Sequence, residues 1–133
     1  MTYNFEWFNP SLGNPIVSIA EYGLGFNKAA IEALGSPEKV RFGFDKKNKI
    51  IAVKSAEDNG DLAFAFAAKE KNRYIRINTK DFVKLIEINI PELNFGKATR
   101  YLARYDEEMG VLLVDLKQTT EAETETETGA IDV

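Results

Sequence analysis

Apolar and polar residues alternate strictly in the middle of the first half of the chain. Val40, Phe42 and Phe44 are each separated by one residue, and this two-residue period predicts a half-buried strand. A polar turn follows, after which residues 50–53 form an apolar run that predicts a returning strand. The pattern therefore indicates a β-hairpin.

A strand and a short helix are predicted before this hairpin. Residues 16–22 are rich in β-forming side chains and predict a strand, and residues 23–25 read Gly-Leu-Gly, which predicts a bend or bulge. Asn27 is a suitable N-cap for a helix, and Gly35 suits the left-handed residue that ends one. The first half thus follows the order strand, short helix, hairpin.

The second half of the chain shows the same order. Apolar residues alternate with alanine in residues 62–66, and residues 74–77 predict another strand, so we expect these two segments to form a hairpin ahead of a second helix. That helix is predicted to bury Phe82 and Leu85, with Ile86 as a further candidate for the buried face. Residues 101–105 alternate again, and a turn and a last strand follow them.

Sliding the chain against itself aligns the two halves. Residues 26–34 align without gaps on residues 77–85, at an offset of 51, and residues 44–53 align on residues 105–114, at an offset of 61. The apolar positions coincide in both blocks, and the extra residues of the second copy fall around residues 89–99. We therefore predict an internal repeat.

The repeat resembles the half-barrel of the AbrB/MazE/SpoVT/MraZ-like swapped-hairpin superfamily. The resemblance rests on Gly23, on the capped helix of residues 27–35 and on the hairpin of residues 40–53, echoed by residues 78–85 and 101–114. It implies an α+β, mainly β fold. The expected architecture is a pseudo-twofold swapped-hairpin-like barrel made from two strand-helix-hairpin repeats with two short helices.

The termini differ in composition from the rest of the chain. We expect residues 1–15 to form an aromatic N-terminal arm and residues 119–133 a disordered acidic tail. Residues 16–118 then form a single domain, with repeats at about residues 16–56 and 62–116. The net charge is −4, but the tail holds five acidic residues and no lysine or arginine, so the domain is close to neutral.

Two interpretations of the acidic tail stay open. Glutamate alternates with threonine there, and almost no apolar side chain is present. The tail can be a solubilising end, or it can resemble a polyanion and compete with nucleic acid for a basic surface of the domain.

Composition excludes most familiar enzyme mechanisms. The chain has no cysteine and no histidine, which excludes thiol nucleophiles, disulfides, Cys/His zinc sites and Ser-His-Asp triads. No glycine-rich nucleotide loop or EF-hand loop is present. We therefore predict a non-enzymatic protein without cofactor or metal. The absence of a membrane-length apolar run and of a signal peptide predicts a cytoplasmic protein without a membrane partner.

The resemblance also implies a DNA-binding transcriptional regulator or an antitoxin-like protein. The candidate DNA contacts are two groups of cations, Arg73, Arg76 and Lys80 around the second helix, and Arg100 and Arg104 farther on. The odd spacing of Arg73 and Arg76 predicts that they point to opposite faces of a strand. Such residues also serve merely to keep sheet edges apart. DNA binding is favoured only if both groups converge on one face.

The N-terminal arm supports a different class of function. Tyr3, Phe5 and Trp7 alternate with polar residues and predict an extended segment with one aromatic face. This face can dock on its own barrel, on a second copy of the chain or on another protein, and base stacking is a weaker alternative. The second hypothesis is accordingly a protein-interaction or assembly module on the same barrel, without nucleic acid.

Overall fold

The computed structural model describes residues 2–3, 13–56 and 63–119. Within these ranges eight strands, two α-helices and one 3-10 helix follow one another along the chain. They are β1 (Ile16–Ala20), β2 (Gly23–Asn27), α1 (Lys28–Leu34), β3 (Lys39–Asp45), β4 (Ile50–Ser55), β5 (Phe64–Ala65), η1 (Ala67–Lys69), β6 (Tyr74–Asn78), α2 (Lys80–Asn89), β7 (Thr99–Asp106) and β8 (Val111–Thr119).

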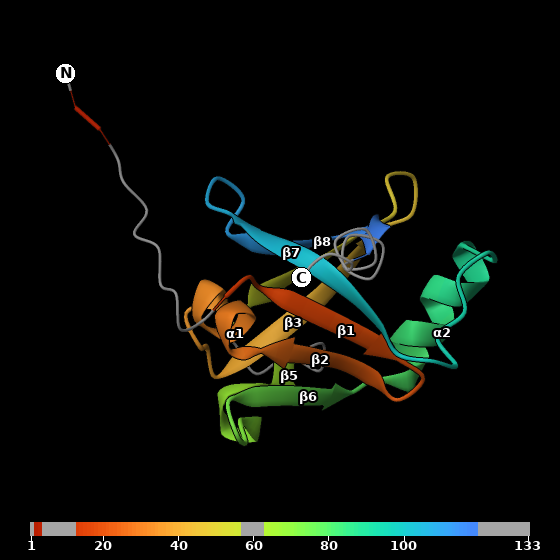
Figure 1. The fold of residues 1–133 in the computed structure, drawn as a ribbon, viewed down its shortest axis with the longest axis horizontal. Coiled ribbons are helices and arrows are strands. Elements are labelled where there is room, and N and C mark those ends of the chain that lie inside the picture. Colours follow the sequence, from red (N-terminus) through yellow and green to blue (C-terminus); the bar gives the residue numbers. More distant parts are fainter. Residues whose placement is uncertain (1, 4–12, 57–62, 120–133) are drawn as a thin grey trace, which may run out of the picture.

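The strands form one antiparallel sheet that curls into a nearly closed barrel (Figure 1). Their order is β5-β3-β4-β8-β7-β1-β2-β6, so β5 and β6 are the two ends of the sheet and do not pair with each other. The helices α1 and α2 lie at opposite ends of the barrel in Figure 1. The predicted mainly β barrel with two short helices is confirmed at this level.

Aromatic side chains from both halves of the chain fill the barrel. Phe26 is fully buried and meets Phe66 edge-on, with ring centroids 5.1 Å apart, and Phe42 in a stacked arrangement at 6.5 Å. Phe82 of α2 also stacks on Phe42, with ring centroids 5.4 Å apart. The core therefore joins β2, β3 and α2 through one aromatic cluster.

Helix α1 begins and ends as its sequence predicts. The Asn27 side-chain oxygen accepts hydrogen bonds from the backbone N–H of Ala30 at 2.9 Å and of Ile16 at 3.0 Å, while its amide donates to the carbonyl of Asn14 at 2.9 Å. Gly35 ends the helix with a φ of 82°. Asn27 thus caps the helix and also fastens the start of β1 to it.

Replacing Asn27 with alanine should lower the free energy of unfolding by about 1–2 kcal/mol, because two backbone donors lose their acceptor. Urea denaturation followed by circular dichroism measures the loss. Asn27→Asp keeps the acceptor and removes only the donor to Asn14, so its loss should be smaller. Equal losses for the two variants would contradict the capping role.

Residues 23–25 form a strand, so the predicted bend is wrong. The turn falls instead at Glu21 and Tyr22, and β2 continues directly into α1. A Cβ atom on Gly23 would overlap the carbonyl oxygen of Ile77, and one on Gly25 would overlap the hydroxyl of Tyr74. Gly23 therefore allows the backbone of β6 to approach closely, and Gly25 leaves room for the Tyr74 side chain.

The predicted hairpin between residues 62–66 and 74–77 is also wrong. Among the described residues 63–66 the strand is Phe64–Ala65, which pairs with β3, while β6 pairs with β2. The backbone N–H of Phe66 donates to the carbonyl of Glu38 at 2.8 Å. These bonds hold the segment against the start of β3, and η1 then turns the chain away.

Helix α2 buries part of the predicted face, but the prediction for Leu85 is wrong. Leu85 is 45% exposed, whereas Val83, Ile86 and Ile90 are buried. Phe82, the other predicted core residue, is half-buried. The helix continues to Asn89, where the extra residues of the second copy were expected to begin, because the apolar spacing extends to residue 90.

The two ends of the chain are described only in part. Tyr3 of the predicted arm is 67% exposed, and Phe5 and Trp7 lie outside the described residues. Thr119 was expected to begin the acidic tail, but it is the last residue of β8. Residues 120–133 lie outside the described part of the chain.

Candidate nucleic-acid interface

Two of the predicted DNA-contacting residues belong to one row that crosses four strands. Arg76 of β6 lies opposite Gly25 of β2, Gly25 lies opposite Ser18 of β1, and Ser18 lies opposite Arg100 of β7. Residues directly opposite each other on antiparallel strands project from the same face of the sheet. We call these four residues the arginine row.

The arginine row lies on the outside of the barrel. Arg76 and Arg100 are exposed, whereas Ile75 and Ile77, which flank Arg76, are buried in the core. Three strand spacings separate the two arginines, so the path between their Cα atoms along the curved sheet is about 14 Å. The four strands contain a single acidic residue, Asp106 at the end of β7. We call the outer surface of β7, β1, β2 and β6 the basic face.

Tyrosine side chains surround Arg76. Its guanidinium carbon lies 4.6 Å from the centroid of the Tyr22 ring, in a cation-π arrangement. Tyr74, two residues before Arg76 on the same face, extends its hydroxyl over Gly25. Burial raises the pKa of the Tyr22 hydroxyl and so does the neighbouring Tyr74, while Arg76 opposes the rise. Arg76 is thus a cation held against a neutral aromatic ring.

Arg104 lies on the same outer face of β7, four residues after Arg100, and it borders a separate groove. The groove has a volume of about 450 Å³. Its walls include the apolar residues Ile50, Leu102 and Leu113, and Asp115 lies there too. Arg104 therefore belongs to the basic face, but it also borders this largely apolar groove, which contains the carboxylate of Asp115.

Arg73 and Lys80 lie outside the arginine row. Arg73 is in the turn before β6, with a φ of 64°, so the prediction that it shares a strand with Arg76 is wrong. Two backbone hydrogen bonds between Lys71 and Tyr74 close this turn, and β6 begins only at Tyr74. Lys80 opens α2 and lines a hollow of about 200 Å³ together with Glu21 and Glu87. The structure thus places Lys80 among acidic neighbours.

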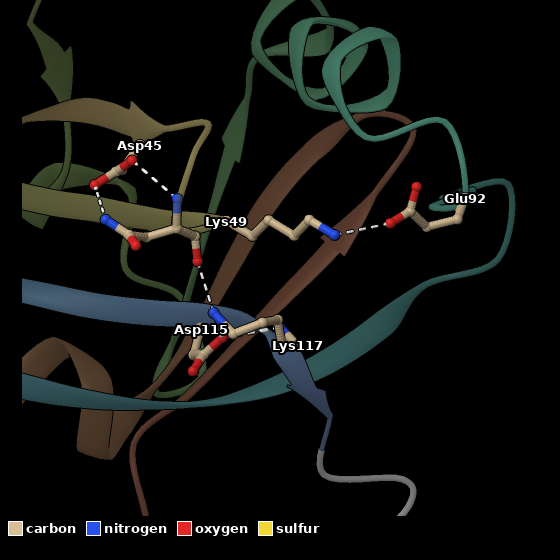
Figure 2. Close-up of polar contacts among 6 residues, drawn as sticks. Asp45, Lys49, Glu92, Asp115 and Lys117 are labelled. Atoms are coloured by element: carbon tan, nitrogen blue, oxygen red, sulfur yellow. Dashed lines mark hydrogen bonds and ion pairs between the residues drawn. The ribbon is translucent and has the colours of Figure 1, made fainter.

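Three lysines outside the basic face, Lys28, Lys49 and Lys117, form ion pairs with nearby carboxylates. Figure 2 shows Lys49 bonded to Glu92 at 3.0 Å and Lys117 to Asp115 at 3.1 Å. The hydrogen bond from Lys49 lowers the pKa of Glu92, and although burial alone would raise that of Asp115, hydrogen bonds from Lys117 lower it. By contrast, no ion pair between described residues includes four of the predicted cations, Arg73, Arg76, Lys80 and Arg104.

The arrangement is suited to a phosphodiester backbone. A guanidinium presents a planar set of donors that bonds two oxygens of one phosphate. The Ser18 hydroxyl between the arginines adds a donor, and the Tyr22 and Tyr74 rings add aromatic surface next to Arg76. In the described part of the chain, no group of three or more acidic residues could hold a metal, and no helix has the length and apolar character to cross a membrane.

Sequence reasoning missed two members of this surface. Tyr22 was assigned to a strand, but it lies in the β1–β2 turn, and only the pairing of β2 with β6 brings it to Arg76. Ser18 carries no signal of its own in the sequence. Tyr74 was detectable, because strand alternation puts it on the same face as Arg76.

Comparison with protein-family models, with curated proteins and with solved structures returns no match for this chain. The geometry of the basic face therefore carries the functional argument.

Proposed function

We propose that the protein is a non-enzymatic nucleic-acid-binding protein that contacts DNA phosphates with its basic face. The observation that carries this proposal is the position of Arg76 and Arg100 in one row on strands that contain almost no acidic residue. Sequence reasoning made convergence of the two cation groups the condition for DNA binding. Arg76 of the first group shares the basic face with Arg100 and Arg104 of the second, which supports the proposal, whereas Arg73 and Lys80 lie outside the row.

We further propose the two-repeat architecture that the superfamily resemblance implies. The pairing of β2 with β6 supports it. Gly23 lies opposite Asn78, and Asn27 lies opposite Tyr74. At the 51-residue offset, Gly23 is equivalent to Tyr74 and Asn27 is equivalent to Asn78. Exchanging equivalent residues therefore turns the first pair into the second. A local twofold axis requires such a mapping.

The second offset supports the same architecture at a different place in the barrel. Ile51 lies opposite Val114, and Val53 lies opposite Leu112. At the 61-residue offset, Ile51 is equivalent to Leu112 and Val53 is equivalent to Val114. Exchanging equivalent residues again turns one pair into the other. Two offsets found in the sequence thus agree with two strand registers. This agreement supports the resemblance and, with it, a regulator or antitoxin-like role.

The test is fluorescence anisotropy with a labelled random-sequence DNA duplex across a salt series. The full chain should bind with micromolar affinity or better at about 50 mM salt, and the affinity should fall steeply as salt rises. Arg76→Gln and Arg100→Gln should each weaken binding about five- to tenfold. Each should also reduce the slope of log affinity against log salt by about 1, because each removes one phosphate contact.

Arg41→Gln is the matched control, because Arg41 is an exposed arginine on the outside of β3, away from the basic face. It should change the affinity less than twofold. Thermal unfolding of each variant confirms that the barrel is intact. Absence of binding by the full chain at low salt, or an equal effect of Arg41→Gln, would overturn the proposal.

The alternative function is a protein-interaction or assembly module on the same barrel. The groove beside Arg104 favours it, because Ile50, Leu102 and Leu113 give that groove apolar walls on the outside of the barrel. Tyr3, Phe5 and Trp7 of the arm are the proposed contacts. A chain that fails to bind DNA but forms a larger assembly by light scattering would favour this alternative.

A further inference from the structure

The last strand ends beside the arginine row. Thr119, the final residue of β8, lies opposite Tyr101 of β7, and Tyr101 directly follows Arg100. The sequence after Thr119 becomes strongly acidic, with glutamate at every second position from Glu121 to Glu127. The chain therefore carries its densest negative charge on a segment that starts next to the basic face.

The acidic segment is long enough to reach both arginines. Glu127 lies eight residues beyond Thr119, and an extended chain of that length spans up to about 26 Å. The row from Arg100 to Arg76 measures about 14 Å. Glutamates two residues apart project to the same side of an extended chain, so the segment can present a line of carboxylates to the row.

Nearer cations are already bonded to other groups. Lys117, two residues before Thr119, contacts Asp115 at 3.1 Å and donates to the backbone carbonyl of Asn48 at 2.6 Å. Lys49 is bonded to Glu92 (Figure 2). The basic face, by contrast, carries several arginines and a single acidic residue on its strands, so its charge is complementary to that of the glutamates.

We propose that residues 120–133 dock on the basic face of their own chain and compete there with nucleic acid. This regulation rests on the proposed function. An intramolecular segment acts at a high effective concentration, so weak contacts are sufficient for measurable competition. Binding then requires DNA to displace the glutamates from Arg76 and Arg100, and the competition weakens as salt screens both interactions.

The test compares full-length variants in the DNA-binding assay. Glu121→Gln with Glu123→Gln should tighten binding about three- to tenfold at about 50 mM salt, because the docked segment loses charge. Glu107→Gln with Glu108→Gln is the control, since it removes the same charge from the exposed β7–β8 turn. It should change affinity less than twofold. Equal changes for the two pairs would overturn the proposal in favour of a general charge effect.

A second measurement needs no nucleic acid. A labelled peptide of residues 119–133 is titrated into a full-length chain in which the four alternating glutamates are glutamine. The peptide should bind in a salt-dependent manner, and Arg76→Gln with Arg100→Gln in that chain should abolish the binding. Absence of peptide binding, or binding insensitive to both arginines, overturns the docking whatever DNA does. Peptide binding without DNA binding would instead contradict the proposed function alone.

Discussion

Replacing Phe26 with alanine is expected to lower the free energy of unfolding by about 3–5 kcal/mol. Phe26 is fully buried and makes ring contacts with both Phe66 and Phe42. The smaller side chain would leave a cavity at the point where β2, β3 and the segment before η1 meet. Urea denaturation followed by circular dichroism measures the loss.

Ile88→Ala is the control for this prediction, because Ile88 is 73% exposed on α2. Its free energy of unfolding should stay within about 0.5 kcal/mol of the original chain. If Phe26→Ala costs no more than Ile88→Ala, the aromatic cluster does not hold the barrel together.

Gly23→Ala is expected to cost about 3 kcal/mol or more, for a backbone reason. Gly23 has a φ of 148°, a conformation that residues with a side chain rarely adopt. A Cβ atom there would also overlap the carbonyl oxygen of Ile77 and the backbone nitrogen of Thr79. Backbone atoms cannot rotate away, so the pairing of β2 with β6 would have to shift.

Gly43→Ala provides a matched comparison in the same sheet. A Cβ atom on Gly43 would come no closer than 4.0 Å to Ala52, and Gly43 has no positive φ. Its unfolding midpoint in urea should be almost unchanged, whereas that of Gly23→Ala should fall sharply. Similar midpoints for the two variants would show that β2 and β6 can separate slightly at little cost.

Local signals in the sequence predict much of this fold. Asn27 and Gly35 delimit α1, and the alternation of residues 40–44 identifies the inward face of β3. Each of these features depends on a residue and its immediate neighbours. Their physical cause lies within a few positions of the chain, so the sequence displays it directly.

Features that depend on distant partners were predicted wrongly. Gly23 and Gly25 were interpreted as a bend, because nothing nearby in sequence announces the close approach of β6. Leu85 was assigned to the core because its spacing from Phe82 fits a helix face, but the buried side of the helix is centred on Val83 and Ile86, of which only Ile86 was a candidate. The spacing of apolar residues identifies a helix or strand, but it does not determine which of its sides packs against the rest of the fold.

The candidate site shows the same division. The sequence identified Arg76 and Arg100 as candidates, but their common row follows from the strand order β7-β1-β2-β6, which joins segments from both ends of the domain. Tyr22 reaches Arg76 for the same reason. Sequence reasoning could state the condition for a basic face, and only the topology could bring the side chains together.

The pairing of Gly25 with Arg76 has a consequence for how such a surface can evolve. If residues 51 apart are equivalent, these two are copies of one ancestral position, facing each other across the proposed axis. A dimer of identical chains would place the same residue at both positions. Two arginines directly opposite would repel each other, and two glycines would provide no charge. Joining both copies in one gene lets mutation change one of them alone, so that an arginine on one strand faces a glycine sheltered by Tyr74 on the other.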